Sequence, residues 1–174
     1  MYDDAVEPLY SEKEIQAKIE ELADRIRADY DGREIRMIGV LKGAFMVISD
    51  LARALRVPLS IDFMSVASYG SGTSTSGVVR ILKDLDSDIA GQHVLVVEDV
   101  IDSGLTLNWL LRNLRSRQPA SIEVAALLRK PEAALVDVPV KYVGFDLPNV
   151  FVVGYGLDYA ERYRNLPFIG TLRS

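Results

Sequence analysis

The chain has 174 residues, of which 49% are hydrophobic and 26% are charged, and this composition is typical of a globular domain with its own core. It contains no cysteine and a single histidine, which excludes disulfides, thiolate metal sites and histidine clusters. Any bound metal must therefore have oxygen ligands, which favours magnesium, manganese or calcium. The formal net charge of −5 gives no attraction toward nucleic acid or an anionic membrane, so we expect neither partner.

The N-terminal residues and the lack of a long apolar run favour a cytoplasmic protein. Residues Met1–Asp4 are acidic and no apolar stretch follows them, so we expect no signal peptide. No apolar run approaches the roughly 20 residues of a membrane-spanning helix. Because no linker or internal repeat divides the chain, residues 1–174 are expected to form one domain.

The first third of the chain predicts helices alternating with strands. Ser11 and Glu14 have the spacing of a capping box, and apolar residues then recur at helical spacing. Pro58 ends the second helix, and the alternation of apolar and polar residues that follows is typical of a strand with one buried face. The elements predicted here are a helix over residues 12–29, a strand over 35–41, a helix over 44–55 and a strand over 59–63.

The rest of the chain continues this alternation after a polar segment. Residues 68–77 are almost all Gly, Ser and Thr and cannot bury enough apolar surface to become ordered by themselves. Residues 93–97 form the most hydrophobic strand, which we place at the centre of the sheet. The other predicted elements are strands over residues 78–82, 122–128, 140–143 and 151–153, a helix with the stripe Leu107, Leu110, Leu111 and Leu114, and a helical turn from Pro131 to Leu135. Together they indicate an α/β fold with a mostly parallel, twisted sheet flanked by helices.

The segment from Val94 to Leu107 contains the strongest chemical signal. A buried strand runs into Glu98 and Asp99, Asp102 follows, and a Ser-Gly-x-Thr turn leads into a helix. Ligands of open α/β sheets bind beyond the carboxyl ends of the strands, and small residues at a helix N-terminus suit a phosphate. The acids beside this turn indicate a magnesium-bound phosphorylated sugar. A solvated acidic loop is the alternative, and Asp102 alone is equally well explained as a helix cap.

The pattern Glu98-Asp99-x-x-Asp102-Ser103-Gly104-x-Thr106 resembles the phosphoribosyl-pyrophosphate-binding motif of the type I phosphoribosyltransferases, in the version of the bacterial hypoxanthine-guanine group. The resemblance extends from about Ile15 to Leu172. It implies the fold of that family, with a small hood formed by the terminal segments. It also implies transfer of the 5-phosphoribosyl group from phosphoribosyl pyrophosphate to hypoxanthine or guanine, Mg²⁺ as cofactor, and a homo-oligomer, either a dimer or a tetramer.

The resemblance assigns the motif to the sugar phosphate and makes Asp102 the catalytic general base. Several members of the family have Thr in place of Ser103 and Lys in place of Leu105, so this chain keeps the hydroxyl and lacks one side-chain cation. The residues implied to bind the ribose and its 5′-phosphate are Glu98, Asp99, Asp102, Ser103, Gly104, Leu105 and Thr106.

A second implied set binds pyrophosphate. In the family, the peptide bond that matches Leu41–Lys42 has a strained, often cis, geometry that exposes an amide, and Ser68-Tyr69 leads a mobile loop that closes over the substrates. Arg164 offers a fork of donors that suits pyrophosphate. From the residues alone, an ordinary helix start with a surface lysine and a plain hairpin tip stay open as alternatives. The implied pyrophosphate set is Leu41, Lys42, Gly43, Ser68, Tyr69 and Arg164.

The third implied set binds the purine. The resemblance gives Lys130 a hydrogen bond to the 6-oxo group and Phe151 a stacking contact with the ring, while the backbone of Val152 reads the base edge. Asp158 reaches the exocyclic edge or a second magnesium, and the implied metal ligands are Glu98, Asp99 and Asp158. Without the resemblance, a solvated lysine and a core phenylalanine remain the simpler interpretations.

Other functions for the same fold remain alternatives. A xanthine-preferring phosphoribosyltransferase would have the same motif. An RNA-binding regulator would need a basic face, which the acidic net charge argues against. An inactive interaction module would not need the full set of polar residues.

Overall fold

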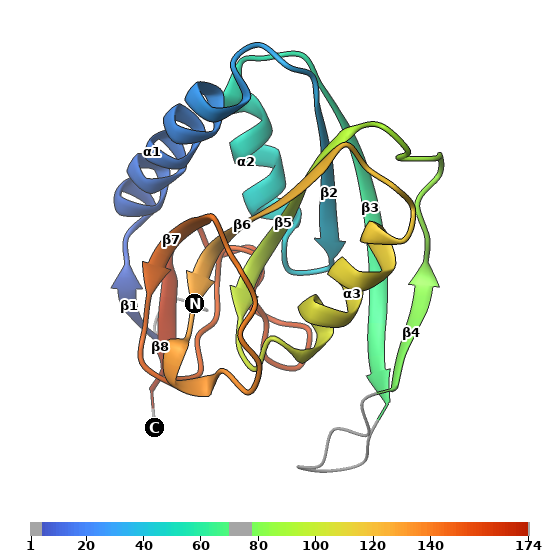
Figure 1. The fold of residues 1–174 in the computed structure, drawn as a ribbon. Helices are drawn as coiled ribbons and strands as arrows, with labels where there is room; N and C mark the ends of the chain where they lie inside the picture. The colour runs from blue at the N-terminus through green and yellow to red at the C-terminus, as the bar shows by residue number, and fades with distance from the viewer. Residues whose placement is uncertain (1–4, 70–77, 174) are drawn as a thin grey trace.

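A six-stranded sheet with the strand order β4-β3-β2-β5-β6-β7 forms the centre of the molecule (Figure 1). The computed structural model describes residues 5–69 and 78–173. Every pair of neighbours in this sheet is parallel except β3 and β4, which are antiparallel. This confirms the mostly parallel sheet and the central position of the strand expected at residues 93–97. The strands are β2 (Ile35–Leu41), β3 (Leu59–Tyr69), β4 (Val78–Lys83), β5 (His93–Ile101), β6 (Ser121–Arg129) and β7 (Tyr142–Asp146).

Helices cover both faces of this sheet. Helices α1 (Glu12–Tyr30) and α2 (Phe45–Leu55) pack on one face, and α3 (Leu105–Arg115) packs on the other (Figure 1). Side chains alternate along β5, so Leu95 and Val97 join the core under α1 and α2, whereas Val94 and Val96 join the core under α3. The same alternation decides where the acids at the end of β5 point.

The start of α1 follows from its sequence. The Ser11 hydroxyl accepts a hydrogen bond from the Glu14 amide at 3.2 Å, and the Glu14 carboxylate accepts one from the Ser11 amide at 2.8 Å, which confirms the predicted capping box. The predicted turn after Lys130 is a short 3-10 helix over Pro131–Ala133. In the described part of the chain, no helix combines the length and apolar character needed to cross a membrane.

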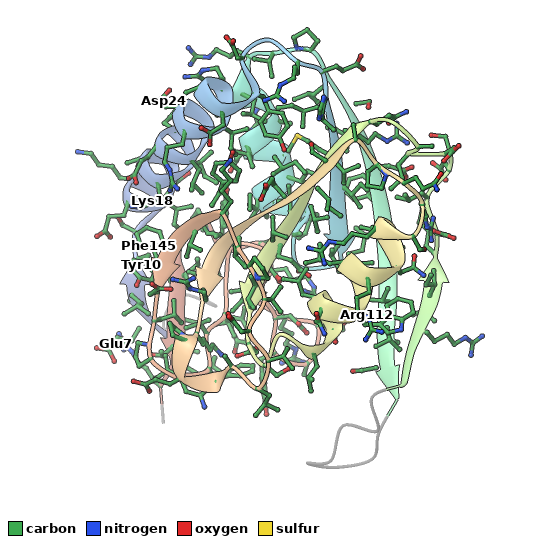
Figure 2. The ribbon with its side chains drawn as sticks, in the orientation of Figure 1. Glu7, Tyr10, Lys18, Asp24, Arg112 and Phe145 are labelled. Atoms are coloured by element: carbon green, nitrogen blue, oxygen red, sulfur yellow. The ribbon has the colours of Figure 1, made fainter. Side chains whose placement is uncertain are left out.

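The terminal segments form a second, smaller sheet. Strand β1 (Val6–Tyr10) pairs antiparallel with β8 (Ile169–Leu172), which confirms the expected hood, although the sequence did not indicate these segments as strands. Tyr10 stacks on Phe145 of β7 with ring centroids 4.1 Å apart, and Lys18 lies over the same ring (Figure 2). The hood is thereby attached to the edge of the main sheet.

Several predicted boundaries were wrong for identifiable reasons. The strand expected at residues 140–143 is β7, which runs over Tyr142–Asp146. Residues 151–153 form only an isolated bridge from Val153 to Gly170, because the chain turns at once through the positive-φ residues 154–156. Strands β3 and β5 run further than expected, since β3 continues against β4 and β5 continues against β6 through Ile101. Of the polar segment 68–77, residues 70–77 lie outside the described residues, as does the side chain of Tyr69.

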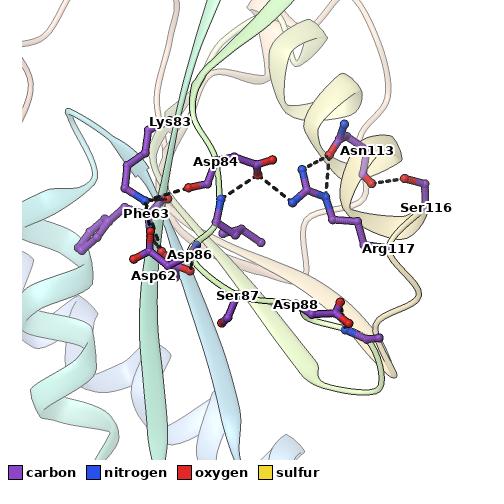
Figure 3. A network of polar contacts seen from close by, with 12 residues as sticks. Asp62, Phe63, Lys83, Asp84, Asp86, Ser87, Asp88, Asn113, Ser116 and Arg117 are labelled. Carbon is purple, nitrogen blue, oxygen red and sulfur yellow. Dashed lines mark hydrogen bonds and ion pairs between the residues drawn. The ribbon is translucent and has the colours of Figure 1, made fainter.

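A polar network joins β3 to the connection between β4 and β5 (Figure 3). Its centre is Asp62, which is 4% exposed and accepts hydrogen bonds from the backbone of Phe63 and Asp86. Arg36 lies 3.0 Å and Lys83 lies 3.6 Å from its carboxylate oxygens. The hydrogen bonds and cations therefore compensate a buried charge on β3, at the position that pairs with Ile38 of β2.

Candidate active site

Three parallel strands end together and deliver polar side chains to one edge of the sheet. Strands β2, β5 and β6 are neighbours, and the residues that directly follow them are Lys42, Asp102 and Lys130. Because parallel strands have their carboxyl ends on the same side, residues distant in the sequence meet here. The edge therefore combines two ammonium groups with the acidic end of β5.

Asp102 and Lys130 form the closest charged pair at this edge. Lys130 Nζ lies 3.1 Å from Asp102 Oδ1, and the lysine side chain is 8% exposed whereas that of the aspartate is 54% exposed. The Lys130 amide also donates a hydrogen bond to the Ile101 carbonyl at 2.9 Å. The lysine is thus buried and fixed, and the carboxylate beside it faces solvent. The sequence alone did not pair these two residues.

Glu98 and Asp99 point to opposite faces of β5. Glu98 lines a cavity of about 230 Å³ on the α3 side, together with the Ser103–Thr106 turn, whereas Asp99 lines a cavity of about 250 Å³ on the side of α1 and α2. Burial raises the pKa of Glu98 well above its ordinary value, with a further rise from Asp99. Burial also raises the pKa of Asp99 to about 6, although the nearby charge of Arg164 opposes this rise. A cation at this edge would favour the charged forms of both groups.

The Ser-Gly-x-Thr turn forms the N-terminus of α3. Gly104 is its N-cap with φ +80°, and the Leu105 amide donates to the Ser103 hydroxyl at 3.3 Å. The Ser103 carbonyl accepts from the amides of Leu135 and Val136, which fixes the turn against the segment after β6. Amides in the first turn of a helix lack intrahelical partners and are suited to an anion. Ser103, Gly104 and Thr106 of this turn line the same cavity as Glu98, so an anion bound by the turn would lie close to this acid.

Gly43 permits a close contact between three segments. A Cβ atom at Gly43 would lie 1.7 Å from Asp99 Oδ2, and a Cβ atom at Gly156 would lie 2.2 Å from the Gly43 carbonyl oxygen. The backbone of Gly43 consequently packs against the Asp99 side chain at the end of β5, and the backbone of Gly156 packs against the backbone of Gly43. The peptide bond Leu41–Lys42 is cis, as the resemblance implied.

The remaining cations meet acids of the C-terminal segment. Arg164 Nη2 lies 3.2 Å from Asp158 Oδ1 and 3.3 Å from Glu161 Oε1, and Arg164 Nη1 donates to the Gly156 carbonyl at 2.8 Å. Lys42 Nζ lies 3.2 Å from Glu161 Oε2. The hydrogen bond and charge of Lys42, with a contribution from Arg164, lower the pKa of Glu161. Arg164 Nε is buried with no hydrogen-bond partner among the described residues.

The cavity on the Asp99 side has an aromatic rim and a polar wall. Phe151 is 56% exposed and touches Tyr159 edge-on, with ring centroids 5.9 Å apart. An exposed phenylalanine contradicts the simpler interpretation of core packing. The cavity of about 250 Å³ is lined by Asp99, Val100, Asp102, Lys130, Phe151, Val152, Leu157, Asp158 and Arg164.

Comparison with known proteins decides the family. The model of the phosphoribosyl transferase domain matches residues 5–160, most of the chain. This chain belongs to the phosphoribosyltransferase family. The hypoxanthine-guanine phosphoribosyltransferase of Mycobacterium tuberculosis (strain CDC 1551 / Oshkosh) is 60% identical over 170 residues, which cover 94% of this chain and 84% of the relative. That of Dictyostelium discoideum is 50% identical over 171 residues, covering 96% and 95%.

Solved structures agree with this family assignment. A hypoxanthine phosphoribosyltransferase from Staphylococcus aureus superposes with a TM-score of 0.96 at 45% identity, covering 99% of this chain and 94% of the other. A hypoxanthine-guanine phosphoribosyltransferase from Bacillus anthracis, with a HEPES molecule in its active site, has a TM-score of 0.92 at 48% identity and covers 96% and 98%. The fold is therefore that of the phosphoribosyltransferases.

Some of the expected site residues of this phosphoribosyltransferase lie apart. Ser68 is at the end of β3, where it pairs with Val79, and among the described residues it lines neither cavity at this edge. Within residues 5–69 and 78–173, no three acidic or histidine side chains gather into a ready-made metal cluster, so Glu98, Asp99 and Asp158 do not form one. Glu161 and Leu157 also belong to this region, although no sequence motif indicated them. The spacing of Asp158, Glu161 and Arg164, three residues apart each time, was the available signal for Glu161.

Proposed function

We propose that the protein transfers the 5-phosphoribosyl group of phosphoribosyl pyrophosphate to hypoxanthine or guanine, giving IMP or GMP and pyrophosphate in purine salvage. The observation that carries this proposal is the edge where the Asp102–Lys130 pair lies beside the N-terminus of α3 and the buried acids of β5. The relatives from Mycobacterium tuberculosis and Dictyostelium discoideum, named for this activity, support it.

The sugar phosphate lies between the α3 turn and the end of β5. The amides of Ser103–Thr106 and the hydroxyls of Ser103 and Thr106 bind the 5′-phosphate, without a side-chain cation at Leu105. Glu98 and Asp99 reach the ribose from the two faces of β5 and accept hydrogen bonds from its hydroxyls. This arrangement fixes the anomeric carbon beside Asp102.

Bond exchange at the anomeric carbon follows from the charges around it. The bond to the pyrophosphate oxygen breaks as positive charge develops on the sugar, and a purine ring nitrogen forms the new bond. Asp102 accepts the proton that this nitrogen loses, acting as a general base. The backbone of residues 41–43, Lys42 and Arg164 offset the charge of the departing pyrophosphate.

Magnesium fits the donor set of this edge. Asp99 and Asp158 line one cavity and Glu98 lines the adjacent one, and all are oxygen donors. Because these residues do not converge as a cluster, we expect the ion to take further ligands from substrate oxygens and water, as Mg²⁺ commonly does. When bound, it neutralises charge on the pyrophosphate and favours the charged forms of Glu98 and Asp99.

Purine selection depends on the cavity at the Asp99 side. The buried ammonium of Lys130 donates to the 6-oxo group and meets a donor if adenine is bound, which disfavours adenine. Phe151 stacks on the ring, the Val152 backbone contacts its edge, and Asp158 faces the exocyclic group. A preference for xanthine is the second candidate, since the same lysine can donate a hydrogen bond to the 6-oxo group of any oxopurine.

The remaining expectations concern the wider setting of this activity. Ser68 and Tyr69, at the end of β3, contribute to the pyrophosphate site, and residues 70–77 after them lie outside the described residues. The chain acts as a single domain in a homo-oligomer, a dimer or a tetramer, in the cytoplasm. Neither nucleic acid nor a membrane takes part.

A spectrophotometric assay tests the proposed function. Purified protein is mixed with phosphoribosyl pyrophosphate, magnesium and one of hypoxanthine, guanine, xanthine or adenine. We expect turnover with hypoxanthine and guanine and none above background with adenine. Absence of turnover with every oxopurine contradicts the proposal, and a rate with xanthine above both others favours the second candidate.

A further inference from the structure

Glu161 forms ion pairs with Lys42 and Arg164, the two cationic side chains that bind pyrophosphate in the proposed reaction. Its Oε2 lies 3.2 Å from Lys42 Nζ, and its Oε1 lies 3.3 Å from Arg164 Nη2. The lysine follows β2 and the arginine follows β7, so one carboxylate bridges two distant segments of the chain. A carboxylate offers a guanidinium and an ammonium the same kind of oxygen acceptor that a phosphate does.

The backbone around Glu161 holds its side chain in this position. Glu161 and its neighbour Ala160 have φ values of +61° and +51°, which non-glycine residues rarely adopt. The Glu161 amide donates to Asp158 Oδ2 at 2.9 Å, and Tyr159 and Arg162 exchange a pair of backbone hydrogen bonds. The turn over residues 159–162, fixed by these hydrogen bonds, therefore directs the Glu161 carboxylate toward Lys42. Such conformations persist where the surrounding structure holds them, often at functional sites.

We propose that Glu161 is an internal substitute for pyrophosphate, which holds Lys42 and Arg164 in the empty site and is displaced when a pyrophosphate group binds. This inference rests on the proposed function, because it takes these two cations as pyrophosphate ligands. Each binding event exchanges the contacts of Glu161 for those of the ligand. Glu161 thereby weakens the affinity for pyrophosphate and assists the release of this product.

The exposures of the three side chains agree with an exchangeable contact. Lys42 and Glu161 are each 66% exposed, so their ion pair is screened by solvent and easily broken. Arg164 is 21% exposed and keeps its contacts with the Gly156 carbonyl and Asp158 when Glu161 moves away. The arginine therefore stays in place to receive the ligand, and the lysine is free to reorient.

Calorimetric titration with pyrophosphate and magnesium tests this inference without turnover. We expect Glu161→Gln to bind pyrophosphate about fivefold more tightly than the unmodified protein, the effect of removing two weak ion pairs. Glu34→Gln is the matched control, because it changes the net charge equally and lies just before β2, at the opposite end of the sheet. We expect this control to leave the affinity unchanged. The gain in Glu161→Gln should shrink as salt is added, since salt screens exposed pairs.

Two results would overturn the inference, and they differ in meaning. If the unmodified protein binds pyrophosphate and Glu161→Gln binds it equally or less tightly, Glu161 is no substitute for the ligand and the proposed function is unaffected. If the unmodified protein binds no pyrophosphate, the proposed function fails and the inference fails with it. Glu161→Asp provides a second variant, because its shorter side chain cannot bridge both cations and should also tighten binding.

Discussion

At the scale of single residues, Asp102 and Lys130 place two functions side by side in the proposed reaction, proton acceptance from the purine and binding of its 6-oxo group. The carboxylate is half exposed and the ammonium 3.1 Å away is buried, so the carboxylate compensates the buried positive charge of the lysine. In the proposed reaction the aspartate receives a proton while the lysine holds the oxygen of the same ring. One ion pair thus orients both groups before the purine arrives.

Replacing the base should remove catalysis without removing binding. We expect Asp102→Asn to lower kcat by about 10²-fold or more, because an amide cannot take the purine proton. Its Oδ1 can still accept from Lys130, so the dissociation constants of both substrates should change little. Stopped assays give kcat and calorimetry gives the affinities. Turnover close to that of the unmodified protein would exclude Asp102 as the base.

Phe151 is suited to a test of purine stacking because it contributes little to the core. Its side chain is 56% exposed, so we expect Phe151→Ala to change the free energy of unfolding by less than about 0.5 kcal/mol. The KM for hypoxanthine should rise by about tenfold, which is the lower range of stacking energies on aromatic side chains. The KM for phosphoribosyl pyrophosphate should stay the same.

A matched control separates stacking from general loss of apolar surface. Leu82 on β4 is 59% exposed and lines neither cavity of the candidate site in the described part of the chain. We expect Leu82→Ala to leave both KM values unchanged. An unchanged purine KM in Phe151→Ala would place the ring outside the purine site.

At the scale of elements, the Asp62 network shows how β3, β4 and the segment after β4 are held together. Burial alone would raise the pKa of Asp62, but hydrogen bonds from the amides of Asp86 and Phe63 and the charges of Lys83 and Arg36 bring it below the ordinary value. The carboxylate connects β3 with β4 and the segment after it (Figure 3). Through Arg36 it also connects β3 with β2. Its charged form is thus part of the folded state.

The sign of the pKa shift fixes how stability depends on pH. Because the folded pKa lies below the unfolded value of about 3.9, Asp62 stabilises the fold above that pH and loses this effect as the pH falls through its folded pKa. We expect Asp62→Asn to cost about 2 kcal/mol at neutral pH, with the difference shrinking in acid below about pH 4. Denaturant unfolding at several pH values measures both.

The control for this prediction comes from the same network. Asp86 also contacts Lys83, but its side chain is 82% exposed, so Asp86→Asn should change stability by less than about 0.5 kcal/mol. A cost for Asp62→Asn that persists unchanged in acid would mean that shape, and not charge, accounts for the effect.

Some helices and strands are determined by their own local sequence, whereas others depend on distant segments of the chain. The capping box, the apolar stripe of α3 and the hydrophobic run of β5 depend on local spacing, and these predictions were confirmed. Strands β1 and β8 depend on each other across nearly the whole chain, so no local pattern indicated them. Residues 151–153 have strand-like side chains, yet the positive-φ turn directly after them prevents a ladder.

At the scale of the whole molecule, the site is assembled from segments that the sequence keeps far apart. Lys42 follows β2, Asp102 follows β5 and Lys130 follows β6, so the strand order determines that they meet. The motif from Glu98 to Thr106 could be recognised in the sequence because its residues are contiguous. The pairing of Asp102 with Lys130, the bridge made by Glu161 and the separation of Glu98 from Asp99 needed the three-dimensional arrangement.

A ligand that contacts all of these segments should stabilise the molecule as a unit. Phosphoribosyl pyrophosphate touches the turn after β2, the end of β5 and the residues around Arg164 in the proposed complex. At a concentration of about 100 times its Kd, it should add about 2.7 kcal/mol and raise the Tm by roughly 5–10 °C. Removing magnesium with a chelator should abolish most of this rise, because Lys42 and Arg164 alone would then offset the charges of the pyrophosphate and of the nearby Glu98, Asp99 and Asp158. IMP lacks the pyrophosphate and should keep most of its own stabilisation in the chelator, which makes it the control in a scanning calorimeter. A rise that is the same for both ligands with and without magnesium would separate the metal from the pyrophosphate and contradict the proposed roles of these acids.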